Sequence, residues 1–202
     1  MTDHPVRLLI VGPQGSGKGT QGARIAAALN IPVVATGDVF RANVSEGTPL
    51  GQEVKAIIEA GELVPDALTS EIVRDRLAQA DAMDRGFVLD GYPRNRGQVD
   101  DLDGFLASAD AQLDAVIELT VPRSESITRL SLRAQQQGRT DDTEDVIAHR
   151  LDIYERETTP ILGVYRERGI VDSIDGVGTP DQITERIVSA LAARGVSVGL
   201  IP

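Results

Sequence analysis

Residues 12–18, Gly-Pro-Gln-Gly-Ser-Gly-Lys, follow a short apolar run, Val6–Val11, and precede an Ala-rich helical pattern over residues 22–29. They match G-x-x-x-x-G-K, with Thr20 one residue later than the usual hydroxyl. Glycines let successive backbone N–H groups surround phosphate oxygens, and the following helix adds the positive end of its dipole. The order strand, loop and helix therefore predicts a phosphate-binding loop. A tight turn that binds nothing is the alternative, and the lysine and the position of the loop disfavour it.

Strands and helices alternate along most of the chain, which predicts a parallel sheet covered by helices on both faces. Ligands of such sheets bind at the carboxyl ends of the strands. The remaining strands are predicted at residues 31–34, Gly86–Asp90, Ala115–Thr120 and residues 170–174. Helices are predicted at residues 96–105, from Pro122, over 143–168 with a break near Pro160, and over 180–194. Helical patterns at 38–45, 51–60 and 66–79, without a strand between them, indicate a helical insertion.

Length, charge and cysteine usage exclude several classes of protein. A chain of 202 residues suits one compact domain. Its net charge of −11 disfavours broad binding to nucleic acid or to anionic membranes. The absence of cysteine excludes disulfides and thiolate metal sites. With no signal pattern and no apolar run long enough to span a bilayer, we expect a cytoplasmic protein.

Four motifs in a fixed order resemble those of adenylate kinases, and the similarity runs from Val6 to Leu191. They are G-S-G-K-G-T-Q at 15–21, T-G-D-V-F-R at 36–41, L-D-G-Y-P-R at 89–94 with Gln98, and G-R-T-D-D at 138–142 with Arg150. The resemblance implies an α/β fold of the P-loop NTPase type with a five-stranded parallel sheet. It also implies a single domain over 1–202 and a monomer. The core would comprise 1–34, 65–131 and 143–202, the AMP-binding helical segment 35–64, and a short lid about 132–142.

The activity implied by the resemblance is reversible, magnesium-dependent phosphoryl transfer, ATP + AMP = 2 ADP, which serves adenine nucleotide homeostasis and AMP salvage. The implied catalytic residues are cations: Lys18, Arg94, Arg133, Arg139 and Arg150. The implied ATP-binding residues are Gly15, Ser16, Gly17, Lys18, Gly19, Thr20, Arg129, Arg133 and Gly178, the last placed with Gly176 in the turn after the final strand. The implied AMP-binding residues are Thr36, Arg41, Glu62, Leu63, Val64, Gly91, Tyr92, Pro93, Arg94, Gln98, Arg139 and Arg150.

Magnesium is expected at Asp90, through water, and at Thr20, because carboxylate and hydroxyl oxygens suit this cation. A carboxylate at a strand end is otherwise an ordinary turn residue. The Tyr92–Pro93 peptide is expected to be cis, as in the family, because an X–Pro bond makes that isomer accessible. Residues 36–38, Thr-Gly-Asp, are expected to end a strand and cap the next helix.

The choice of base rests on Gln98, four residues after Arg94, where adenylate kinases place the amide that reads adenine. An amide both donates and accepts, which suits the edge of adenine. The related UMP/CMP kinases tend to carry Asn at the Gln98 position and Ala at that of Thr36. Asn95 occurs in those pyrimidine enzymes too. A UMP/CMP kinase or a GTP:AMP phosphotransferase is therefore the enzymatic alternative, and a nucleotide-sensing P-loop protein the non-enzymatic one.

The segment between Arg133 and Arg139 is short, which resembles the short-lid members of the family, and the lack of cysteine excludes a zinc-bearing lid. Arg129 and Arg133 are four residues apart and share a helix face, which is also typical of a solvated basic face. We further expect residues 195–202 to be loosely attached and His149 to lie on the surface.

Overall fold

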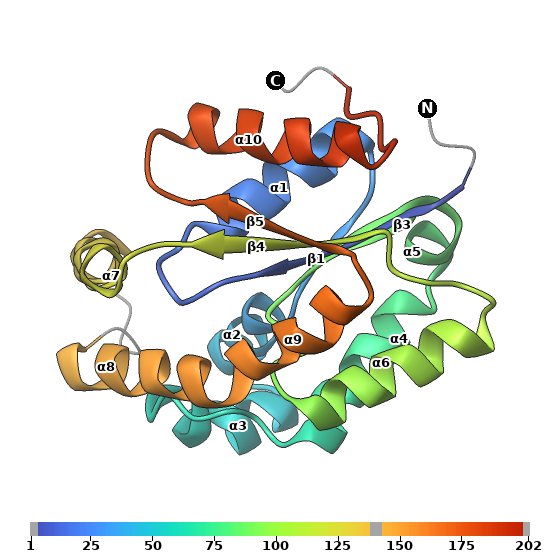
Figure 1. Ribbon diagram of the computed structural model, residues 1–202. Coiled ribbons are helices and arrows are strands. Elements are labelled where there is room, and N and C mark those ends of the chain that lie inside the picture. The colour runs from blue at the N-terminus through green and yellow to red at the C-terminus, as the bar shows by residue number, and fades with distance from the viewer. Residues whose placement is uncertain (1–3, 138–142, 200–202) are drawn as a thin grey trace.

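The computed structural model describes residues 4–137 and 143–199. Within them, five strands form one sheet in the order β2-β3-β1-β4-β5, and every neighbouring pair is parallel (Figure 1). The strands are β1 (Val6–Val11), β2 (Val33–Ala35), β3 (Gly86–Asp90), β4 (Ala115–Thr120) and β5 (Val171–Asp175). The predicted parallel α/β fold is confirmed.

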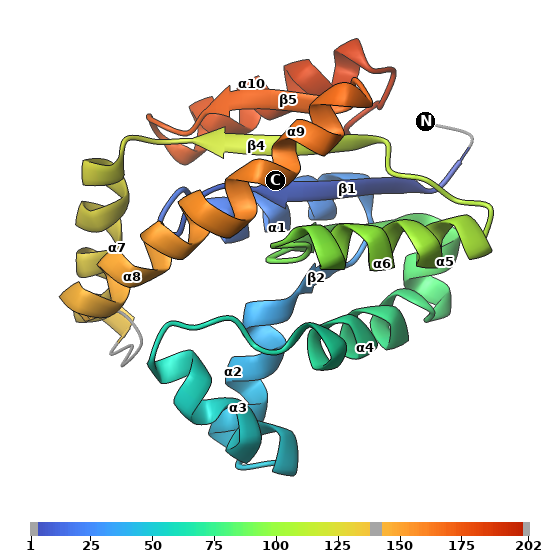
Figure 2. The same cartoon turned by 60° about the horizontal axis from the view of Figure 1, so that its bottom comes forward.

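Helices cover both faces of this sheet. Helices α1 and α10 pack on one face, and α4, α6 and α9 lie on the other (Figure 1). Helices α2 and α3 extend beyond the sheet on the side of α4, and α7 and α8 stand at the carboxyl end of β4 (Figure 2). The helices are α1 (Lys18–Leu29), α2 (Thr36–Glu46), α3 (Pro49–Glu59), α4 (Asp66–Leu77), α5 (Ala80–Arg85), α6 (Arg96–Ser108), α7 (Arg123–Gln137), α8 (Glu144–Ile153), the π-helical turn η1 (Tyr154–Thr158), α9 (Thr159–Glu167) and α10 (Pro180–Ala193).

The core lies on both sides of the sheet because successive side chains of a strand point to opposite faces. In β1, Leu8 and Ile10 pack with residues of α1 and α10 such as Ile25. Leu9 packs on the other side, with residues of α6 and α9 such as Tyr165. Since both faces are covered, β1, β3 and β4 are largely apolar, which is why they were predictable as buried runs.

Several element boundaries differ from those predicted. Helix α1 begins at Lys18 rather than at residue 22, because Gly17 takes a left-handed conformation, with φ of 96°, and forms the N-cap. Strand β2 begins at Val33, since the N–H of Ile31 bonds back to Ala26 at the end of α1. Strand β5 starts one residue later than predicted for a similar reason, because the N–H of Ile170 bonds to Tyr165.

The predicted cap of α2 is wrong. The helix begins at Thr36 itself, its N-cap is Ala35, and no side chain makes a capping hydrogen bond. The hydroxyl of Thr36 instead donates to the carbonyl of Gly91 at 3.0 Å. Asp38 lies inside the first turn, where it accepts from Arg41 at 2.6 Å. Thr36 is therefore directed to a partner just after β3, whereas Asp38 pairs within its own helix.

Two features of the helices were not predicted from the sequence: helix α5, and the π-helical form of the chain near Pro160. Helix α5 spans only six residues, too short to show a clear period. The predicted break near Pro160 is a π-helical turn, η1, which joins α8 to α9 without interrupting the helix. Here the N–H of Thr159 bonds to Tyr154, five residues back, and Pro160 stands at the first turn of α9, where its missing N–H costs least.

Residues 195–199 are not loosely attached, so that prediction is wrong for them. Val196 is 3% exposed, and Val198 packs against the same cluster of side chains beside α10. The N–H of Val196 also bonds to Leu191. The turn after α10 therefore returns the chain to the core.

Helices α2 and α3 have a small apolar core of their own, centred on Phe40, Val54 and Val64. A further cluster, with Leu130 and Ile147, joins α7 to α8. Among the described residues, no helix has both the length and the apolar character that crossing a membrane requires.

Candidate active site

The phosphate-binding loop lies between β1 and α1, at the carboxyl end of the central strand. Gly15 and Gly17 have φ of 79° and 96°, a region that glycine enters without strain. Ser16 is fully buried, and its Oγ has no hydrogen-bond partner among the described residues. The Lys18 ammonium lies over the loop and donates to the carbonyls of Gly12 and Pro13 at 2.6 and 2.9 Å. The loop therefore holds one cation directly above the turn that leads into α1.

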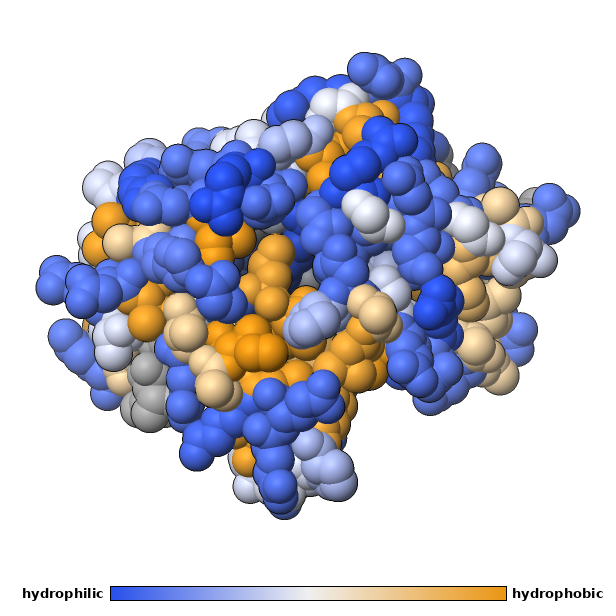
Figure 3. All heavy atoms as spheres, turned by 90° about the horizontal axis from the view of Figure 1, so that it is seen from below, coloured by the Kyte–Doolittle hydropathy of each residue, from blue (hydrophilic) through white to orange (hydrophobic). Residues whose placement is uncertain are grey.

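A cleft of about 490 Å³ opens beside this loop, and the charged residues that line it are mainly cations. Among its described lining residues, Asp38 and Asp90 are the only acids. Figure 3 shows the face that α2, α3 and α8 share, where apolar side chains gather about a hollow within a hydrophilic rim. The cations that line the cleft are Lys18, Arg41, Arg94, Arg129, Arg133 and Arg150. In a chain of net charge −11, this convergence favours a highly anionic ligand.

Charge crowding and burial perturb the groups in the cleft. Burial lowers the pKa of Lys18 to about 8; the arginines Arg94 and Arg150 contribute to the lowering, while Asp90 opposes it. Burial, with Arg150 beside it, lowers the pKa of Arg94 to about 10, so this side chain stays charged at neutral pH. Burial raises the pKa of Asp90, against the attraction of Lys18. Phosphate groups in the cleft would relieve the repulsion among the cations.

A second hollow adjoins the cleft between α2, the end of α3 and the β3–α6 loop. Thr36, 2% exposed, and Arg94 converge on one atom, the carbonyl oxygen of Gly91, at 3.0 and 2.7 Å. The Tyr92–Pro93 peptide is cis, as predicted. Leu63 and Val64 also line this hollow, as do Arg41, Glu62 and Gln98. The predicted AMP-side residues within the described chain are thus brought together.

Tyr92 is oriented away from a ligand role. Its ring is 2% exposed, and its hydroxyl bonds to Ser70 at 2.8 Å and donates to Asp101 at 2.9 Å. Burial raises the pKa of this phenol. Its side chain therefore anchors the β3–α6 loop to α4 and α6.

Gln98 makes two hydrogen bonds through its carboxamide. Its Oε1 accepts from the backbone N–H of Arg94 at 2.8 Å, and its Nε2 donates to Asp66 at 2.7 Å. Asn95, the N-cap of α6, also donates to Asp66 and accepts from the backbone N–H of Gln98. Sequence reasoning missed Asp66, because no local signal pairs it with a residue 32 positions away.

Glu62 connects the α2–α3 unit to α8. Its carboxylate lies 2.7 Å from the Nε2 of His149, so this histidine, though on the surface as predicted, has a partner. The backbone just before it is also close to α8, since a Cβ at Gly61 would lie 2.8 Å from a side-chain carbon of Arg150. Helix α8 thus touches the rim of the second hollow.

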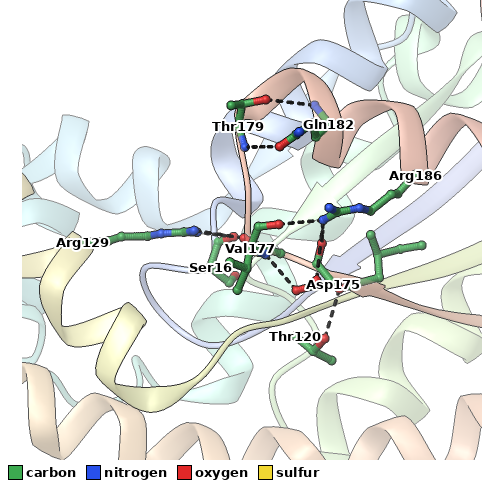
Figure 4. A network of polar contacts seen from close by, with 10 residues as sticks. Ser16, Thr120, Arg129, Asp175, Val177, Thr179, Gln182 and Arg186 are labelled. Atoms are coloured by element: carbon green, nitrogen blue, oxygen red, sulfur yellow. Dashed lines mark hydrogen bonds and ion pairs between the residues drawn. The ribbon is translucent and has the colours of Figure 1, made fainter.

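The turn after β5 lies beside the phosphate-binding loop (Figure 4). Arg129 reaches from α7 to donate to the carbonyl of Gly176 at 3.0 Å, and it pairs with Glu125 at 2.7 Å. Arg186 holds the same turn through the carbonyls of Asp175 and Val177 (Figure 4). Gly178, with φ of 131°, contacts α10 and is not among the described residues that line the cleft.

The lid arginines fall into two groups. Arg129, Arg133 and Arg150 all line the cleft. The two of them on α7, Arg129 and Arg133, therefore do not form a purely solvated face. Arg139 lies outside the described residues. Thr158, which the sequence did not single out, also lines the cleft and donates to the carbonyl of Arg94 at 2.9 Å.

The oxygen atoms near Lys18 that could hold a magnesium ion belong to Asp90 and Thr20. Asp90 lines the cleft, and even a Cβ at Gly19 would make only an ordinary contact with its Oδ2, at 3.9 Å, so this side of the carboxylate is not crowded. Thr20 lines the same cleft and is exposed. Among the described residues, no three His, Asp or Glu side chains converge on a metal site. One carboxylate, from Asp90, and one hydroxyl, from Thr20, suit a cation that keeps several bound waters and takes its other ligands from substrate phosphates, as Mg²⁺ does.

Comparison with known proteins agrees with this geometry. The family model described as adenylate kinase matches residues 10–170. An adenylate kinase of Kocuria rhizophila is 54% identical over 92% of this chain and 98% of its own length. Those of Leifsonia xyli and Thermobifida fusca are 53% and 48% identical, each over 94% of this chain and over 94% and 100% of their own lengths. The chain belongs to the adenylate kinase family, whose members are phosphotransferases.

Proposed function

We propose that this adenylate kinase transfers the terminal phosphoryl group of ATP to AMP within the cleft, reversibly, to give two molecules of ADP. The observation that carries the proposal is the convergence of six cations on the cleft beside the phosphate-binding loop of an acidic chain. Two polyanionic tails that face each other need such a set. A single nucleotide would not call for the separate hollow that Gln98 and Arg94 line.

ATP would be held by the loop glycines, by Ser16, Thr20 and Lys18, and by Arg129, Arg133 and Gly178. AMP would be held by Thr36, Arg41, Arg94, Gln98, Arg139, Arg150 and the backbone of residues 62–64 and 91–93. The set is supported by the position of its described members around the two hollows, Ser16 and Gly178 excepted. Arg139 enters through the family resemblance alone.

The reaction needs no nucleophile from the protein. An oxygen of the AMP phosphate attacks the terminal phosphorus of ATP, a new P–O bond forms, and the bond to the β-phosphate oxygen breaks, so that ADP leaves. Catalysis then consists of alignment and of neutralising the charge on the transferred group. Lys18, Arg94, Arg133, Arg139 and Arg150 supply that positive charge.

Magnesium would be held by Asp90, through water, and by Thr20, with the remaining ligands from ATP. When bound, the ion neutralises charge on the phosphates and fixes their orientation. The position of Asp90 and Thr20 in the same cleft supports this assignment.

We further propose that residues 35–64 and a lid at about 132–142 close over the core formed by 1–34, 65–131 and 143–202. Closure would exclude water, which otherwise accepts the phosphoryl group in place of AMP. The separate apolar core of α2 and α3 supports their movement as a unit.

A coupled assay with ATP and a panel of acceptors tests the function. We expect turnover with AMP well above that with UMP or CMP, faster with ATP than with GTP, and lost in Lys18→Met. Equal use of AMP and UMP would favour the pyrimidine alternative. Nucleotide binding without turnover would favour a sensor. We expect a cytoplasmic monomer, which sedimentation of the pure protein checks for oligomeric state.

A further inference from the structure

The carboxamide of Gln98 has both of its ends tied to protein atoms before any base is considered. The side chain is 2% exposed, and its Oε1 accepts from the Arg94 backbone N–H at 2.8 Å. On the other end, its Nε2 donates to Oδ1 of Asp66 at 2.7 Å. One lone pair on Oε1 and one hydrogen on Nε2 remain for a ligand.

The two partners fix which end of the amide is which. A backbone N–H can only donate, and an ionised carboxylate can only accept. Turning the Gln98 amide by 180° would place N–H against the N–H of Arg94 and oxygen against the carboxylate of Asp66. The second of these contacts is the more costly, since it replaces a hydrogen bond to a charged group by repulsion at short range.

Asp66 is itself held in place. It is the first residue of α4, where a carboxylate interacts favourably with the helix dipole. The side-chain amide of Asn95 donates to its Oδ1 and Oδ2 at 2.9 and 3.1 Å. Asn95 in turn accepts from the backbone N–H of Gln98 at 3.0 Å. The three residues therefore form a closed ring of hydrogen bonds, with the carboxylate as its only charged member.

A fixed amide distinguishes two kinds of purine. The edge of a 6-aminopurine offers a donor at N6 and an acceptor at N1, whereas a 6-oxopurine offers an acceptor at O6 and a donor at N1. An amide that could turn over would satisfy either edge. We propose that Asp66 is a positioning residue that holds the Gln98 carboxamide in one orientation and so makes the pocket select a 6-aminopurine over a 6-oxopurine monophosphate. This inference rests on the proposed role of Gln98 in reading the base.

The test compares kcat and KM for AMP and for IMP, with ATP as donor, in the wild type and in Asp66→Ala. We expect the ratio of kcat/KM for AMP to that for IMP to fall about tenfold, as for loss of one hydrogen bond to a charged group. The change should lie mainly in KM. Asp66→Asn, which keeps one acceptor oxygen, should restore part of the ratio. Asp100→Ala is the matched control, because Asp100 lies on α6 beside Arg96 and outside the ring.

A double-substitution cycle with Gln98→Ala separates positioning from a general structural effect. If Asp66 acts through Gln98, Asp66→Ala changes the ratio little once Gln98→Ala is present. An unchanged ratio in Asp66→Ala, or an equal loss for AMP and IMP, would overturn the inference, and Asp66→Asn carries the same comparison should the alanine variant fail to fold. Failure of the proposed function is distinct, since it would show as wild-type protein without a preference for AMP over UMP.

Discussion

Thr158 donates a hydrogen bond from its hydroxyl to the carbonyl oxygen of Arg94 at 2.9 Å. Thr158 is the last residue of the π-helical turn η1 and is 6% exposed, while Arg94 lies in the loop between β3 and α6. The bond therefore connects the helix that carries Arg150 to the loop that carries Arg94. These two arginines approach each other closely enough to lower the pKa of Arg94.

We expect Thr158→Val to weaken this connection. The substitution keeps the shape of the side chain but leaves the partly buried carbonyl of Arg94 without this donor, at a cost of about 1 kcal/mol. Urea denaturation should report that loss, and KM for AMP should rise because Arg94 is less firmly held. Thr159→Val is the matched control, since Thr159 is exposed. Equal stability of the two variants would contradict the assigned role of the bond.

The pKa of Lys18 predicts the pH dependence of ATP capture. Burial and the neighbouring arginines lower it from 10.5 to about 8, so the ammonium loses its proton as pH rises through that value. We expect kcat/KM for ATP, which reports the free enzyme, to fall above about pH 8. The corresponding break in kcat should lie at higher pH, because bound phosphates stabilise the charged form. In Lys18→Arg the remaining activity should show no break in this range, and a break there would assign the titration to another group.

Gly91 occupies a position where any other residue would be strained. Its φ is 83°, and a Cβ there would lie 2.8 Å from Oγ1 of Thr36. Gly91→Ala should therefore lower the free energy of unfolding by about 2 kcal/mol and also impair AMP binding. Gly104→Ala is the reverse case, because nothing lies within 4 Å of a Cβ at that position on α6. It should stabilise the protein by about 0.5–1 kcal/mol. Similar denaturation midpoints for both variants would refute this distinction.

Asp90→Asn tests the magnesium assignment. The substitution removes the carboxylate beside Lys18 while keeping its size. We expect the Mg²⁺ concentration for half-maximal activity to rise about tenfold, since a hard cation loses its anionic anchor. The pKa of Lys18 should fall further, because Asp90 raises it in the wild type. Asp38→Asn, at the other acid of the cleft, serves as the comparison, and an equal shift in both variants would remove the special role of Asp90.

Much of the architecture follows from local sequence, because local physics determines it. The apolar run of β1, followed by the glycines and Lys18, can hardly be accommodated except as strand, loop and helix. Strands β3 and β4 were predicted to the residue, since turn residues or polar residues bound each apolar run. What failed depends on contacts between distant segments. The early start of α1, the use of Thr36 as a donor to Gly91, and the burial of Val196 are settled by tertiary partners.

The candidate site divides in the same way. The charged residues of the site could be predicted from the motifs, and the structure brings three of them, Lys18, Arg94 and Arg150, to one cleft. The supporting groups, Asp66 and Thr158, carry no pattern of their own. Asp66 meets Gln98 across 32 positions and Thr158 meets Arg94 across 64, so only the fold can pair them.

The π-helical turn has a consequence for insertions and deletions. A π turn is equivalent to one extra residue within an α-helix. Since the wider turn absorbs that residue, removing one residue from 154–158 would make the helix regular while the segments on both sides keep their facing. Arg150 would stay at the cleft, and Ile161 and Tyr165 would stay in the core beside the sheet. A second deletion, with no wide turn left to absorb it, would instead rotate Arg150 by about 100° about the helix axis and away from the cleft.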